Sequence, residues 1–80
     1  MNRNLKTLLD TYVINKVKEK RVEKGFSQFN LAVKLSVSSG FIGKVESFQT
    51  TAKYNLNHLN KLALIFNCSL KNFLPDNPIV

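Results

Sequence analysis

The chain has 80 residues, which is enough for one small domain with a single core but not for two. Twelve Lys and Arg residues against five Asp and Glu residues give a net charge of +7, which favours a polyanionic partner such as nucleic acid or an acidic membrane surface. A merely soluble basic surface is the alternative, and charge alone does not separate the two. The hydrophobic content of 44% excludes a disordered tail.

Cysteine usage and hydropathy indicate the cellular compartment. Cys68 is the only cysteine, so an internal disulfide is excluded and a reducing environment fits. No apolar run is long enough for a signal peptide or a membrane span. We therefore expect a cytoplasmic protein with no membrane partner.

The first predicted helix covers Thr11 to Lys24. Its apolar residues Ile14, Val17 and Val22 are expected to face inward, and Gly25 ends it by taking a left-handed conformation. Apolar residues at helical spacing precede it, so the helix has room to begin earlier. We interpret residues 1–11 as an N-terminal extension that packs on the core or forms an arm, rather than as a dedicated dimer contact.

Two short helices with a tight break between them follow, from Ser27 to Glu46. Ser27 is placed to cap the first of these helices and Ser38 the second, with the break at Ser36 and Val37. The second helix is predicted to run from about Ser38 to Ser47. A connection this short is typical of a helix-turn-helix, in which the second helix stands at a steep angle to the first.

The C-terminal half predicts two further helices after a polar loop at residues 47–55. Asn55 is expected to cap a helix that runs to Phe66, with an inner face made of Leu56, Leu59, Leu62, Ala63 and Phe66. Ser69 is expected to cap a short fifth helix, which Pro75 stops. Residues 75–80 form a short tail.

The cations gather around the two-helix stretch. Ten of the twelve lie between Arg3 and Lys53, and only Lys61 and Lys71 follow. This placement favours nucleic acid as the partner.

The chain resembles the Xre helix-turn-helix family, which includes Cro and the phage repressors, from about Ile14 to Leu74. The residues that carry the resemblance are Arg21, Gly25, Phe26, Ser27, Gln28, Leu31, Ala32, Val37, Ser38, Phe41, Ile42, Glu46, Leu62, Ala63, Phe66, Ser69, Leu70, Phe73 and Leu74. The resemblance implies an all-α, five-helix, lambda-repressor-like domain of bacterial or phage type. A single domain would fill residues 1–80, with its core at 12–74.

The resemblance also implies roles for particular residues. Arg21 and Glu46 would form a partly buried structural ion pair. The base-facing positions of the second helix would be Ser39, Gly40, Gly43 and Lys44, with Ser38 at its start. Lys44 is able to donate to guanine O6 and N7.

Phosphate contacts are expected on both sides of that helix. Gln28 would meet a phosphate at the start of the preceding helix, and Thr50, Thr51 and Lys53 would do so in the following loop. Two glycines on a reading helix permit either very close approach to the groove or few base contacts with reliance on charge and DNA shape. We favour few base contacts.

The sequence contains few candidate catalytic residues. His58 is the only histidine, and the five acids are scattered rather than paired. His58 and Cys68 fall short of the three or four ligands of a zinc site, and the three glycines form no phosphate cradle. We therefore expect no enzyme activity, no metal and no cofactor.

Two hypotheses remain. The first is a sequence-specific double-stranded DNA-binding transcription regulator that acts as a homodimer, with residues 70–80 as the dimer surface. The second is a protein-interaction module on the same fold, such as an antitoxin with a toxin partner.

Overall fold

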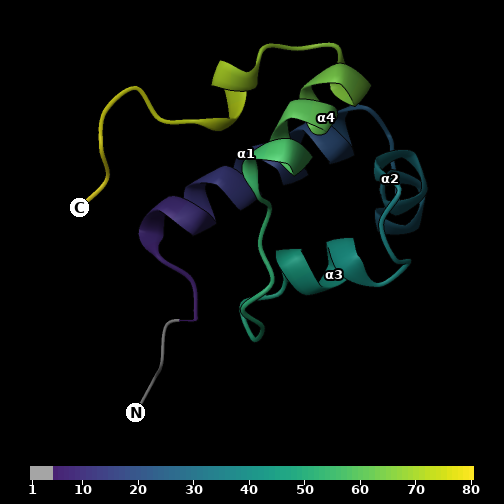
Figure 1. Ribbon diagram of the computed structural model, residues 1–80, viewed down its shortest axis with the longest axis horizontal. Coiled ribbons are helices and arrows are strands. Elements are labelled where there is room, and N and C mark those ends of the chain that lie inside the picture. Colours follow the sequence, from purple (N-terminus) through teal and green to yellow (C-terminus); the bar gives the residue numbers. More distant parts are fainter. Residues whose placement is uncertain (1–4) are drawn as a thin grey trace.

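The computed structural model describes residues 5–80; the first four residues of the expected extension, including Arg3, lie outside that part. The described chain contains four α-helices and a final 3-10 helix (Figure 1): α1 Leu8–Glu23, α2 Gln28–Leu35, α3 Phe41–Glu46, α4 Leu56–Phe66 and η1 Leu70–Phe73. It contains no strand, so the all-α class is confirmed. The expected fifth α-helix is instead a 3-10 helix of four residues.

One core joins all of these elements. In Figure 1, α1 and α4 cross at the centre, while α2 and α3 stand to one side of them and the C-terminal tail extends along the other. Completely buried side chains come from every helix: Val17 from α1, Leu31 from α2, Ile42 and Val45 from α3, Leu62 from α4 and Phe73 from η1. The two short helices are thus held by packing rather than by their own propensity.

α1 begins earlier than Thr11. Thr7 caps it: the Thr7 hydroxyl accepts from the Asp10 backbone N-H at 3.0 Å, and the Asp10 carboxylate accepts from the Thr7 N-H at 2.9 Å. This second bond lowers the pKa of Asp10. At the other end Gly25 takes φ +78°, as expected. Val22 does not face inward; it lies in the last turn and is 60% exposed.

The break between α2 and α3 is longer than expected. Ser27 caps α2 with Asn30 as its capping-box partner, and Ser36 ends it with φ 62°. Ser38, however, caps nothing: its carbonyl accepts from the Phe41 N-H in a turn, and Gly40 precedes α3 without a side-chain cap. The turn consumes residues 37–40, so α3 starts at Phe41 and has six residues.

α4 and η1 follow the predicted start signals. The Asn55 side chain accepts from the His58 N-H at 2.8 Å, and the His58 Nδ1 accepts from the Asn55 N-H at 3.0 Å. Ser69 caps η1 through a bond from the Lys71 N-H. Leu56 does not join the inner face; as the first residue of α4 it is 72% exposed. Among residues 5–80 no helix is both long and apolar enough to cross a membrane.

Two threonines test where α1 begins. We expect Thr7→Ala to lower the free energy of unfolding by about 1 kcal/mol, because it removes the cap. Thr11→Ala lies inside the helix and should change it by less than about 0.5 kcal/mol. Urea unfolding followed by circular dichroism measures both. A larger loss for Thr11→Ala would contradict this start for α1.

Candidate nucleic-acid interface

α3 is fixed to α1 by an ion pair. Arg21 Nε lies 2.8 Å from Glu46 Oε2, and Arg21 Nη2 donates to Glu46 Oε1 at 3.0 Å. The side chains are only 11% and 4% exposed. A third donor, Nη1, bonds the Phe26 carbonyl at 2.8 Å. The guanidinium thus joins the end of α3 to α1 and to the segment between α1 and α2.

Gln28 lies across α3 at Gly43. Its Nε2 donates to Glu46 Oε1 at 2.9 Å, so the amide reaches from the first residue of α2 to the last residue of α3. A Cβ at position 43 would meet Gln28 Oε1 at 3.2 Å. The missing side chain of Gly43 is therefore explained inside the molecule: it leaves room for Gln28.

Backbone carbonyls at the C-terminal end of α3 accept hydrogen bonds from side chains of two other segments. The Lys6 ammonium donates to the carbonyls of Val45 (2.8 Å), Lys44 (3.4 Å) and Ser47. The Thr50 hydroxyl also donates to the Lys44 carbonyl. Lys6 is 8% exposed, and this burial lowers its pKa, against the opposing effect of Asp10. Nothing in the sequence around Lys6 signals this contact, which spans 38 to 41 residues.

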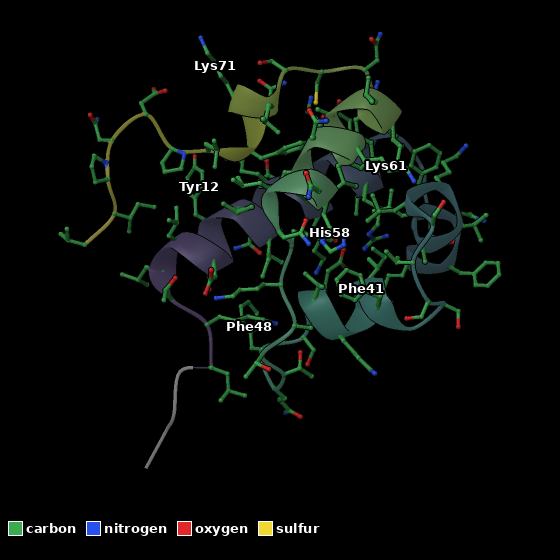
Figure 2. All side chains as sticks on the ribbon, viewed as in Figure 1. Tyr12, Phe41, Phe48, His58, Lys61 and Lys71 are labelled. Atoms are coloured by element: carbon green, nitrogen blue, oxygen red, sulfur yellow. The ribbon has the colours of Figure 1, made fainter. Side chains whose placement is uncertain are left out.

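Two further lysines are engaged with the protein itself. Lys61 extends from α4 and donates to the Leu35 carbonyl at the end of α2, at 3.2 Å (Figure 2). Lys53 lies 3.5 Å from the Asp10 carboxylate and so links the loop after α3 to α1. Part of the basic charge therefore acts at helix ends and in bridges.

An aromatic cluster supports α3 from behind. The Phe41 ring centroid lies 5.2 Å from His58 and 6.1 Å from Tyr54, and Figure 2 shows Phe41 and His58 together at the centre of the molecule. Burial raises the pKa of Tyr54, whose hydroxyl is buried without a hydrogen-bond partner among the described residues. Phe41 is thus part of the packing, whereas Phe48 is 63% exposed.

The expected contact residues fall into two groups. Ser38, Ser39, Gly40, Lys44 and Thr51 are exposed, and nothing lies within 4 Å of a Cβ built on Gly40. Gln28, Thr50 and Lys53 are bonded to Glu46, Lys44 and Asp10 respectively, and Gly43 lies beside Gln28. Side chains of His, Cys, Asp and Glu form no group of three that would hold a metal ion within residues 5–80.

Solved structures share this fold, although no family model and no curated protein matches the sequence. A hypothetical transcription factor, NHTF, from Neisseria has a TM-score of 0.72 at 22% identity, over 84% of this chain and 75% of that one. The restriction-modification controller protein C.AhdI from Aeromonas hydrophila has 0.68 at 23%, over 80% and 94%. The iron(II) form of HppE has 0.70 at 18%, over 90% of this chain but only 38% of that one. These likenesses show a helix-turn-helix-like fold.

A double-mutant cycle tests the contact between Gln28 and Gly43. Ala in place of a helical Gly raises the free energy of unfolding by about 1 kcal/mol, but here the new Cβ would push against the Gln28 amide. We expect Gly43→Ala to gain the full amount in a Gln28→Ala background and less in the natural chain. Denaturant unfolding of the four proteins measures the difference. Equal gains in both backgrounds would contradict the contact.

Proposed function

We propose that the protein is a double-stranded DNA-binding transcription regulator of the Xre type, with α3 and the turn before it in the major groove. The observation that supports this most is the two-sidedness of α3. Ile42 and Val45 are completely buried in the core, whereas Lys44 and the residues before the helix, Ser39 and Gly40, are exposed. A helix-turn-helix presents the N-terminal part of its second helix to base edges in this way.

Few side chains are available to read bases. Lys44 is the one cation on α3 and is able to donate to guanine, while the Ser39 hydroxyl serves either a base or a phosphate. Gly40 offers no side chain, and Gly43 is screened by Gln28. We infer that the protein reads few bases and relies on charge and on DNA shape for the remainder of its selectivity.

Phosphate contacts complete the proposed interface. Ser38 and Thr51 are exposed on the two sides of α3. Gln28 is the first residue of α2 and keeps one amide hydrogen beyond its bond to Glu46, which we propose meets a phosphate. Thr50 and Lys53 would belong to the same interface, although their bonds to the Lys44 carbonyl and to Asp10 also give them a role in holding α3 and its loop.

The fold comparisons support this proposal. Two of the similar structures, of which this chain covers 75% and 94%, are a hypothetical transcription factor and a restriction-modification controller. The proposed function places the protein where its DNA is, which we propose is the cytoplasm.

A homodimer would give the protein two reading helices about 34 Å apart, one turn of DNA. The proposed dimer surface, residues 70–80, contains Leu74, which is 39% exposed and lines a groove with Leu9 and Leu56. Leu9 and Leu56 are themselves 43% and 72% exposed. These three side chains form an apolar patch that a second copy of the chain would cover.

Binding to duplex DNA tests the proposed function. We expect the logarithm of the affinity to fall with the logarithm of salt concentration with a slope of roughly −4 or steeper, because each phosphate neutralised contributes about −0.9. Fluorescence anisotropy with duplexes selected from a random pool gives this slope. A flat salt dependence would refute the proposal.

Lys44→Ala tests whether Lys44 reads a base in the same binding assay. It should weaken binding to the selected duplex about tenfold and lower its preference over random DNA, since a base contact is worth about 1–3 kcal/mol. Lys18→Ala removes the same charge from an exposed position on α1 and is the control. If both variants bind alike, Lys44 does not read DNA.

One observation favours the alternative, a protein-interaction module with a partner such as a toxin. Phe29 and Val33 lie one turn apart on α2 and are 60% and 61% exposed, which is an apolar surface beside the proposed DNA face. A partner protein that binds the chain normally after Lys44→Ala, together with unchanged DNA binding, would support this alternative.

The dimer proposal has its own test. We expect Leu74→Asp to convert a dimer into a monomer, because the substitution places a charge in the apolar patch. Sedimentation equilibrium measures the association, with Leu64→Asp as a control at another exposed leucine, on α4. A natural chain that is monomeric at all concentrations, or a Leu74→Asp dimer, would refute this surface.

A further inference from the structure

We propose that Lys6 is a positioning residue for α3: its ammonium, carried by the segment before α1, holds the C-terminal end of the helix and so sets where Lys44 stands. This inference rests on the proposed function, because the position of Lys44 matters only if α3 reads DNA. Residues 5–7 would then be part of the DNA-binding unit although they need not touch DNA.

Each hydrogen of the Lys6 ammonium has an acceptor in this contact. An ammonium has three hydrogens and no acceptor, and Lys6 has three carbonyl acceptors, those of Lys44, Val45 and Ser47. The last carbonyls of a helix lack partners within the helix and carry its negative dipole end. A buried charge is tolerated where such partners are supplied, and Lys6 is 8% exposed.

The segment that carries Lys6 is itself anchored. Thr7 and Asp10 form the capping box of α1, and Asp10 also pairs with Lys53 of the loop after α3. Lys6 therefore reaches α3 from a fixed base. The contact joins two parts of the chain 38 to 41 residues apart.

The contact bears on Lys44 directly. The Lys44 carbonyl accepts from the Lys6 ammonium and the Thr50 hydroxyl, in addition to the Ser47 N-H, while the Lys44 side chain is exposed. α3 has only six residues, so fraying of its last turn would move Lys44. Two donors from outside the helix restrain that turn.

This role predicts a signature that a phosphate contact would not give. A lysine that neutralises a phosphate changes the salt slope by about 0.9 when it is removed. Lys6 is directed at carbonyls, so its removal should lower affinity without changing the slope. The amide hydrogens of α3 should also exchange faster, because their helix loses its restraint.

The experiment compares Lys6→Met with Lys18→Met in the full chain. Lys18 is an exposed lysine on α1, so the control removes the same charge. We expect Lys6→Met to bind the selected duplex about tenfold more weakly than Lys18→Met, since charge-assisted hydrogen bonds are roughly twice as strong as neutral ones. The salt slopes of the two variants should agree. Amide exchange at Val45, Glu46 and Ser47 should quicken relative to α4 in Lys6→Met alone.

Three outcomes would overturn the proposal. They are equal affinities for the two variants, a salt slope that is less steep by about one per subunit in Lys6→Met, and unchanged amide exchange in α3. A natural chain that binds no duplex would refute the regulator function and the DNA part of this inference, whereas the exchange measurement tests the hold on α3 without DNA. If Lys6→Met fails to fold, Thr50→Val removes the other side-chain donor to the Lys44 carbonyl and should quicken amide exchange in α3, a measurement made without DNA. Natural exchange in Thr50→Val would then count against the proposal.

Discussion

The position of α3 depends on the ion pair between Arg21 and Glu46. A helix of six residues has no stability of its own in water, so its orientation must come from contacts with the remainder of the fold. The Glu46 carboxylate accepts from Arg21 of α1 and from Gln28 of α2, and the same guanidinium bonds the Phe26 carbonyl. A buried pair adds little net stability over an apolar one, but breaking it is costly. Its effect is therefore to select one arrangement of three helices.

Some cations of the chain hold helix ends or loops, and the others are left for the proposed binding of DNA. A net charge of +7 describes the composition, but Lys6 and Lys61 donate to carbonyls at the ends of α3 and α2, and Lys53 pairs with Asp10. Each of these cations is balanced by a helix end or a carboxylate. The charge that remains for a polyanion is smaller than the total, and on α3 it consists of Lys44 alone. Composition predicts the sign of the partner's charge better than it predicts which residues meet it.

Local signals in the sequence predicted local structure well. Ser27, Asn55 and Ser69 cap the elements they precede, and Gly25 takes a left-handed conformation. The same reasoning was wrong at Ser38, because a serine before an apolar pattern signals a cap equally well when a turn intervenes. It missed Lys6 altogether, and it assigned Gln28 and Thr50 to phosphates without their bonds to Glu46 and Lys44. Those bonds join residues brought near only by tertiary structure, so no short window of sequence contains them.

Gly43 shows how the architecture limits the reading surface. A long side chain at this position would compete with Gln28 for the same space, and displacing Gln28 would remove one acceptor bond from Glu46. The glycine therefore has a role in the way α2 and α3 are joined, and its expected contact with DNA stays a prediction. With Gly40 also lacking a side chain, selectivity in the proposed complex depends on how accurately the backbone around Lys44 is placed. The donors at the C-terminal end of α3 fit this requirement, since a helix that reads through few side chains depends on the position of each.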